Sequence, residues 1–230
     1  MNFPGNETIL QEIREELIRL SKRDPDATRR GIHAGSWRSS YELEKQSGHS
    51  CVQAAIDIAE HRARVLGKES WYVTKMWAKI DYAGTNGQIH NHGGDVAGIW
   101  YIDAGDSNLD DGALLFYPDA NLKNPKKTGE VLLVPKTDLM VFWHAPMMHK
   151  LPFYSSNRPR IALLFRIDDV QSPPTRDWKE WPGEPLTQEH VERQRAASVR
   201  PQTSLRQDGE RPVKRQSIEW SGEAWTRQEL

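Results

Sequence analysis

The feature that most constrains the fold is a series of short β-rich runs that begins at Ser70. From this point the sequence pattern changes to a period of two, and clusters of Gly, Pro, Asn and Asp separate the runs. So many short strands in about a hundred residues predict a sandwich or a jelly roll. The predicted strands are 71–82, 88–92, 96–102, 113–117, 130–134, 139–143, 149–153 and 160–167.

Two helices are predicted ahead of the strands. In the first, Thr8 to Gln11 fits the Gln form of a capping box and Asp24-Pro25 ends the helix. The second is expected over 50–66, with Ser50 as its N-cap. Both carry an apolar stripe at helical spacing, so we expect them to pack on the sheet and the fold to be mainly β with flanking helices. The stripe of the first helix consists of Ile9, Ile13, Leu17 and Leu20.

These patterns divide the chain into three parts. Residues 1–67 are expected to be helical support elements packed on the barrel, and residues 68–170 the jelly-roll core. Residues 171–230 are rich in Pro, Gln, Arg, Glu and Ser, which is typical of a tail. Within it, 177–182 is expected to lie on the domain or on a partner subunit, and 193–217 to be mobile. The tail holds four large indoles, which would suit a homodimer: Trp178, Trp181, Trp220 and Trp225.

Composition narrows the classes of partner. The formal net charge is -1, and acidic and basic residues are mixed along the chain. This charge pattern does not predict binding to nucleic acid or to an anionic membrane. Cys51 is the one cysteine, so an internal disulfide is impossible and a reducing setting is expected. No run reaches the roughly 18 apolar residues of a membrane span, and 1–20 does not read as a signal peptide. We expect a cytoplasmic protein with a small-molecule or peptide substrate.

Three histidines form the candidate metal site. His90 and His92 are two residues apart, so on an extended chain both rings lie on one face. If His149 faces the same space from another strand, the three imidazoles would hold one transition-metal ion and leave its other side open. His144 competes for the third position, but it lies where a strand runs into a turn, whereas His149 opens the next extended piece. A pair of ordinary surface histidines would leave His149 unexplained.

Two arginines are candidates for binding a carboxylate near the metal. Arg160 opens the last predicted strand, and an arginine there can pair with a carboxylate through two hydrogen bonds. Arg158 is the weaker candidate because it precedes Pro159 in a loop. A solvated surface arginine is the ordinary alternative for both.

Together these motifs resemble the small Fe(II)- and 2-oxoglutarate-dependent oxygenases of the double-stranded β-helix superfamily. The resemblance covers about 130 residues, and the motifs occur in the right order. They are Gly35-Ser36-Trp37-Arg38-Ser39, Trp77-Ala78-Lys79-Ile80, His90-Asn91-His92-Gly93-Gly94, Gly98-Ile99-Trp100-Tyr101-Ile102, Gly112-Ala113-Leu114-Leu115-Phe116, His149 and Arg160-Ile161-Ala162.

The resemblance implies a jelly-roll barrel, the double-stranded β-helix, with Fe(II) at its mouth. It also implies that 2-oxoglutarate chelates the iron and pairs its far carboxylate with Arg160. The implied reaction is hydroxylation of a small-molecule or peptide-like substrate, coupled to oxidative decarboxylation of 2-oxoglutarate to succinate.

The first motif departs from the superfamily pattern, in which a carboxylate stands two residues after the first histidine. Three arrangements remain open. His90, His92 and His149 could form a three-histidine site, as in cupin-type dioxygenases that do not use 2-oxoglutarate. Asp95 could swing in as the carboxylate, and in any case it lies close enough to touch a substrate. His92 could instead be the first ligand with Gly94 in the carboxylate position, as in 2-oxoglutarate-dependent halogenases, where chloride takes the vacant place.

A non-catalytic function is also a hypothesis for this chain. The chain could be a metal-stabilised jelly-roll binding module in which the histidines grip a structural zinc ion. Structural zinc sites are closed and four-coordinate, so a fourth protein ligand such as His144 would favour the binding module.

Overall fold

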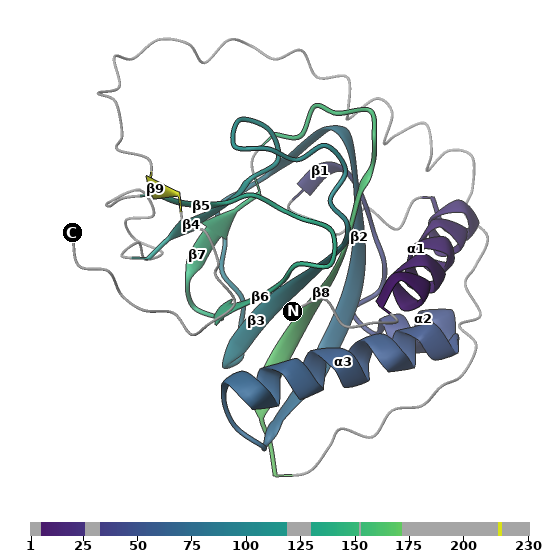
Figure 1. Ribbon diagram of the computed structural model, residues 1–230, viewed down its shortest axis with the longest axis vertical. Helices are drawn as coiled ribbons and strands as arrows, with labels where there is room; N and C mark the ends of the chain where they lie inside the picture. Colours follow the sequence, from purple (N-terminus) through teal and green to yellow (C-terminus); the bar gives the residue numbers. More distant parts are fainter. Residues whose placement is uncertain (1–5, 26–32, 119–129, 152, 172–215, 218–230) are drawn as a thin grey trace.

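The computed structural model describes residues 6–25, 33–118, 130–151, 153–171 and 216–217. The three helices lie in the first third of the chain with one strand, β1, among them, and strands make up the other described elements (Figure 1). In chain order the elements are α1 (Asn6–Arg23), β1 (His33–Arg38), α2 (Leu43–Ser47), α3 (Ser50–Leu66), β2 (Trp71–Gly87), β3 (Val96–Asp103), β4 (Leu114–Tyr117), β5 (Val131–Leu133), β6 (Met140–His144), β7 (Met148–Lys150), β8 (Arg160–Asp169) and β9 (Gln216–Ser217).

The strands form two sheets. A five-stranded sheet has the order β1-β2-β8-β3-β6, with every neighbouring pair antiparallel. A four-stranded sheet has the order β7-β4-β5-β9, in which β9 runs parallel to β5. From β5 on, successive strands alternate between the two sheets, as expected for a jelly roll. The prediction of a mainly β fold with flanking helices is confirmed.

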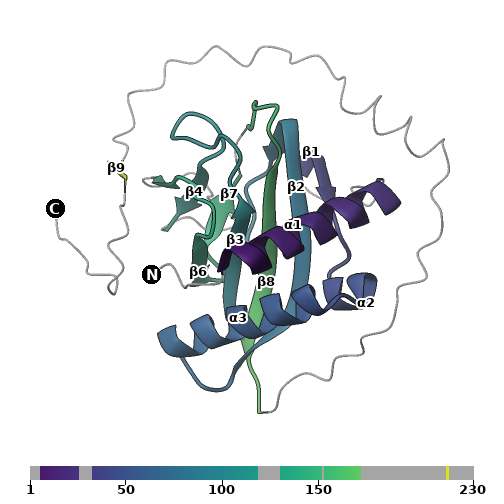
Figure 2. The ribbon, with the colours of Figure 1, turned by 45° about the vertical axis from the view of Figure 1, so that its right-hand side comes forward.

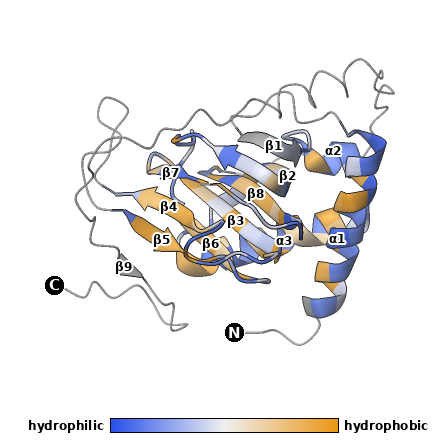
Figure 3. Ribbon diagram, turned by 90° about the horizontal axis from the view of Figure 1, so that it is seen from above, coloured by the Kyte–Doolittle hydropathy of each residue, from blue (hydrophilic) through white to orange (hydrophobic). Residues whose placement is uncertain are grey.

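Helices cover one face of the five-stranded sheet (Figures 2 and 3). In α1 the predicted stripe is correct, because Ile13, Leu17 and Leu20 are all buried. The apolar face of α3 packs into the same core. Burial on this face explains why the first helices are stable despite their polar outer surfaces. The sheet contributes Ile80, Trp100, Ile102, Ile161, Leu163, Phe165 and Ile167.

The opposite face of this sheet meets the smaller sheet and lines the interior of the jelly roll (Figure 3). Alternation along the strands divides their residues between the two faces. On β3, for example, Trp100 joins the helix-side core and Tyr101 the interior. The interior apolar cluster consists of Ala97, Ile99, Tyr101, Leu114, Phe116, Val141, Trp143, Ala145, Leu151 and Ala162.

Several local predictions were wrong. Helix α1 begins at Asn6, so Thr8 lies inside it and no capping box forms there. The N-cap of α3 is His49, whose Nδ1 accepts a hydrogen bond from the Cys51 amide at 3.2 Å, and Ser50 is the first helical residue. Strand β1 and helix α2 were not predicted.

The segment 88–92 was predicted as a strand and is instead a connection after β2, which runs on to Gly87. Its only ladder contact is an isolated bridge between His90 and His149. Segment 193–217 was expected to be mobile, yet Gln216 and Ser217 pair with β5. The four tail tryptophans and 177–182 lie outside the described residues. In the part of the chain that the structure describes, no helix is long and apolar enough to cross a membrane.

Candidate metal centre and interior charge cluster

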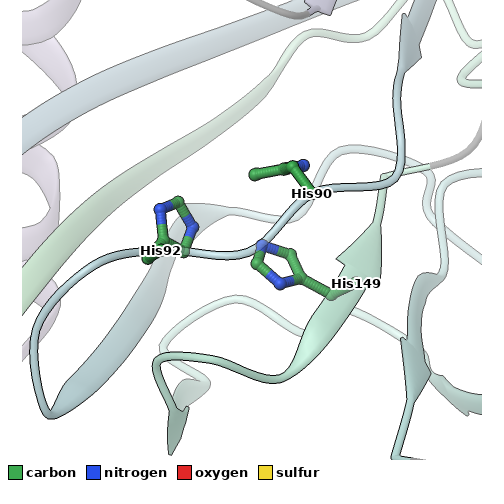
Figure 4. A group of neighbouring side chains, drawn as sticks. All are labelled: His90, His92 and His149. Carbon is green, nitrogen blue, oxygen red and sulfur yellow. The ribbon is translucent and has the colours of Figure 1, made fainter. Parts of the chain in front are cut away.

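The structure brings His90, His92 and His149 together (Figure 4). One ring nitrogen from each lies within 4.8 Å of the other two. His149 comes from β7, and the other two come from the connection between β2 and β3. This connection is fixed by the backbone, because His90 and His149 exchange both amide hydrogen bonds and the His92 amide donates to the Ala145 carbonyl at 2.9 Å. The single bridge between His90 and His149 therefore positions the histidines, which the strand predicted at 88–92 was expected to do.

The hydrogen bonds of two rings determine which nitrogen faces the centre. His90 Nδ1 lies 2.9 Å from the Gln88 carbonyl oxygen, and His149 Nδ1 lies 3.0 Å from that of Met147. A carbonyl oxygen only accepts, so each Nδ1 carries the proton and donates. Each Nε2 is then the unprotonated nitrogen, and the Nδ1 hydrogen bond orients the ring, as in metal-binding histidines.

Burial keeps all three imidazoles neutral near pH 7. It lowers the pKa of His92 to about 4, with a further contribution from His90, and that of His149 to about 3. The pKa of His90 is also lowered by burial. Three neutral imidazoles with ring nitrogens this close together suit a divalent transition metal, since such ligands must be unprotonated.

Aromatic side chains pack around the three histidines. Trp143 meets His149 edge-on at a centroid distance of 5.0 Å, and Trp77 lies 5.7 Å from His92. Phe116 packs on Trp143 at 5.4 Å. The Nε1 of Trp143 is buried and has no hydrogen-bond partner among the described residues. His90 and His92 remain half-buried, so the centre is open on one side.

The other candidate ligands do not join the cluster. Asp95 is exposed, and its Oδ2 accepts a hydrogen bond from the Asp169 amide at 2.8 Å. Gly94 has a φ of +98°, and a Cβ there would lie 2.5 Å from Asp168 Oδ1 and 2.6 Å from Arg166 Nε. A side chain at position 94 would thus point at β8. His144 is exposed at the end of β6, so among the described residues no fourth side chain closes the site. The structure thus groups the three histidines and places Asp95 and Gly94 outside that group.

Arg160 lies inside the barrel, as the first residue of β8, and is only 1% exposed. Its Nε and Nη2 both donate to Asp81 Oδ2, at 3.0 and 2.8 Å, and its Nη1 donates to the Gly112 carbonyl. Asp81 is its cross-strand partner on β2. The main donors of the guanidinium are therefore already used within the protein.

Lys79, a residue we did not predict, completes an interior charge cluster with Asp81 and Arg160. Its Nζ lies 2.6 Å from Asp81 Oδ1. Burial, aided by Arg160, lowers the pKa of Lys79 to about 8, although Asp81 opposes the shift. Burial alone would raise the pKa of Asp81, but Lys79 and Arg160 lower it overall. With Lys79 protonated, the cluster has two buried cations and one carboxylate.

The interior cluster also holds unused hydrogen-bond donors. Neither Lys79 Nζ nor the buried hydroxyl of Tyr101 has a hydrogen-bond partner of good geometry in the described part of the chain. The sequence contains a signal for Lys79 and Asp81. In a strand, Trp77, Lys79 and Asp81 are each two residues apart, so their side chains share one face.

Arg158, the second arginine candidate, lies elsewhere. It is exposed and pairs with Asp103 at 2.9 Å and with Asp106 at 3.8 Å. It lines a surface cleft between α1 and β3. These contacts do not connect it with the histidines.

Solved structures share this fold. The chain is similar to AviO1 from Streptomyces viridochromogenes Tue57, with a TM-score of 0.57, 14% identity, and coverage of 76% of this chain and 89% of that one. It is also similar to HygX from Streptomyces hygroscopicus, solved with nickel, 2-oxoglutarate and hygromycin B (TM-score 0.54, 13% identity, 78% and 82% covered). A third is the non-heme alpha-ketoglutarate-dependent epimerase SnoN from nogalamycin biosynthesis (TM-score 0.55, 14% identity, 80% and 85% covered).

No family model matches the chain, and no curated protein matches its sequence. The structural matches establish the double-stranded β-helix fold. The chain therefore has a double-stranded β-helix fold in which three histidines lie close together.

Proposed function

We propose that the protein is an Fe(II)- and 2-oxoglutarate-dependent oxygenase that hydroxylates a small-molecule or peptide-like substrate. The observation that carries this proposal is the combination of two sites in one interior. Three neutral imidazoles can bind one side of a metal ion. A fully buried charge cluster with one excess cation lies on β2 and β8. HygX, which shares the fold, was solved with nickel and 2-oxoglutarate. The fold and this pair of sites support the same chemistry here.

The interior cluster suits the far carboxylate of 2-oxoglutarate. A carboxylate there would balance the second cation and accept from the two unused donors, Lys79 Nζ and the Tyr101 hydroxyl. Arg160 would contribute its charge, while its hydrogen bonds to Asp81 and Gly112 hold the cluster in place. This refines the expectation that Arg160 itself pairs with the carboxylate.

The metal would be held by the Nε2 atoms of His90, His92 and His149. Bound Fe(II) would supply the electron transfer to oxygen. In the reaction, 2-oxoglutarate would be oxidised to succinate and carbon dioxide, and the substrate would be oxidised to an alcohol. The residues of this chain orient the imidazoles, exclude water with Trp77, Trp143 and Phe116, and fix the cosubstrate from its far end.

One other function is favoured by a specific observation. The three-histidine geometry suits a cupin-type dioxygenase that does not use 2-oxoglutarate. The two candidates differ in their need for the interior cluster, since only the 2-oxoglutarate enzyme requires a buried cation for a cosubstrate carboxylate.

The test uses protein purified without oxygen and then supplied with Fe(II), 2-oxoglutarate and oxygen. Succinate formation is expected, and calorimetry with the nonreactive metal Ni(II) should show 2-oxoglutarate binding. His149→Ala should abolish both signals, whereas His144→Ala should keep them. If the wild-type chain binds metal but neither binds 2-oxoglutarate nor forms succinate, the proposal fails and the cupin-type alternative stands.

A further inference from the structure

The inner face of the five-stranded sheet carries far more positive than negative charge. Its cations and acids are assigned to this face by cross-strand pairing, because paired residues point the same way. The whole chain has a net charge of -1, so the excess is local. The cations are Arg38, Lys75, Lys79, Arg160 and Arg166, and the acids are Asp81 and Asp168.

Two pairs of like charges stand directly opposite each other on this face. Arg38 on β1 pairs in register with Lys79 on β2, and Lys75 on β2 pairs with Arg166 on β8. Like charges in such positions destabilise a sheet. Arg166 is offset by Asp168 at 2.8 Å, and Lys79 by Asp81. Among the described residues, Arg38 and Lys75 have no carboxylate partner.

Arg38 and Lys75 converge on one exposed ring. The Arg38 guanidinium lies 4.2 Å from the centroid of Tyr41, and the Lys75 ammonium lies 5.5 Å from it. Arg38 Nη1 donates to the Tyr41 hydroxyl at 2.6 Å, while Arg38 Nε is buried without a partner. Tyr41 is 44% exposed, so solvent reaches this group from outside.

This rim connects with the metal centre through stacked rings. Tyr41 meets Trp77 edge-on at 5.1 Å, and Trp77 lies 5.7 Å from His92. Trp77 is itself only 7% exposed, so one buried ring separates Tyr41 from the histidines. We call Arg38, Tyr41 and Lys75 the anion rim.

We propose that the substrate is a small organic oxyanion whose charged group binds the anion rim, while its reactive part reaches past Trp77 to the histidine centre. This inference rests on the proposed function for the reaction, but the binding site itself does not need the metal. The interior cluster and the anion rim would then hold two different anions, the cosubstrate and the substrate.

The test is calorimetry with the full chain and a panel of carboxylates, phosphate monoesters and sulfate esters. Each acid is matched to a neutral amide or alcohol of the same skeleton, and 2-oxoglutarate is present throughout at a fixed concentration. At least one acid should bind about tenfold or more tightly than its neutral partner, the effect of one charge-assisted hydrogen bond. The class of acid preferred distinguishes the three oxyanion sources.

Variants locate the binding. In Arg38→Gln/Lys75→Gln the preference for the acid should disappear, and the exposed control Lys136→Gln should retain it. Lys79→Met, which alters the interior cluster, should weaken 2-oxoglutarate binding and leave the preference unchanged. Lys75→Gln alone, an exposed substitution, serves if the double variant does not fold.

Two results would overturn the inference: no acid binds better than its neutral partner, or the double variant keeps the preference. A wild-type chain that binds the acids but not 2-oxoglutarate would count against the proposed function and leave the anion rim standing.

Discussion

His90 and His149 exchange both of their backbone hydrogen bonds, at 2.9 and 2.8 Å, although they lie in different segments of the chain. This is the closely bonded geometry of an antiparallel pair, and it holds two cluster histidines in fixed relation. Both rings are oriented further by their Nδ1 hydrogen bonds. The centre is therefore organised by the backbone without help from a bound ion.

Removing one cluster histidine should abolish tight metal binding. His149→Ala is expected to lower the affinity for Fe(II) or Ni(II) at least about 100-fold, because losing even a supporting hydrogen bond costs about 10- to 100-fold. Metal content after dialysis and titration calorimetry measure this. His144→Ala, which alters an exposed histidine outside the cluster, should bind metal as the wild type does.

Affinity for 2-oxoglutarate should depend on the protonation of Lys79. Its pKa is lowered by burial to about 8, so the free protein loses this cation as the pH rises past 8, and affinity for a carboxylate should fall. Calorimetry from pH 7 to 9.5 should show this decline in the wild type. In Lys79→Met the affinity should be lower throughout and nearly independent of pH. Equal pH profiles for the two proteins would contradict the assignment.

The same shift has a consequence for stability. The pKa of Lys79 falls from 10.5 to about 8 on folding, so above pH 8 the unfolded chain binds the extra proton. The free energy of unfolding should therefore rise between about pH 8 and pH 10, relative to that of Lys79→Met. Urea unfolding of both proteins across this range measures the difference.

Neutralising Asp81 should destabilise the fold strongly. Asp81→Asn leaves Arg160 and Lys79 buried without a counter-charge, and breaking a buried pair in this way costs about 3–5 kcal/mol. Denaturant unfolding measures the loss. Asp169→Asn removes an exposed carboxylate paired with Lys68 and should cost far less. A small effect of Asp81→Asn would mean that the interior is wetter than the structure indicates.

Two glycines with similar backbones allow a matched comparison. Gly94 and Gly84 have φ values of +98° and +92°, but a Cβ at Gly84 meets nothing within 4 Å, whereas at Gly94 it collides with Arg166 and Asp168. Gly84→Ala should cost about 1 kcal/mol for the left-handed backbone alone. Gly94→Ala should cost roughly 1–3 kcal/mol more, and it should also weaken metal binding by displacing His92. Equal unfolding free energies for the two variants would show that the collision is relieved without cost.

The sequence was sufficient to predict what depends on local pattern. The period of two marks β2, largely apolar runs mark β3 and β8, and the stripe containing Ile13 and Leu17 marks α1. The three histidines could be grouped because ligand chemistry restricts the residue types. In place of the strand expected at 88–92, a single antiparallel bridge joins His90 to His149 of β7, and no local pattern distinguishes these two outcomes.

The interior cluster depends on contacts that no local pattern specifies. That Asp81 would take up the hydrogen bonds of Arg160 follows from the register of β2 with β8, 79 residues apart in sequence. Because the sequence does not specify this register, we expected Arg160 to be available to a ligand. Lys79 was not predicted as a site residue. The anion rim likewise depends on Tyr41, in a turn between β1 and α2 whose position is set by tertiary packing.

Strand β2 has a consequence for how this protein could diversify. Lys75, Trp77 and Lys79 lie on one face of this 17-residue strand, whereas the metal-binding histidines come from β7 and the connection after β2. Recognition and reactivity are thus encoded in separate stretches of the gene. Substitutions at Lys75 or its neighbours can alter which molecules are accepted while the metal ligands stay intact, so a lineage could acquire new substrates by changing a single strand.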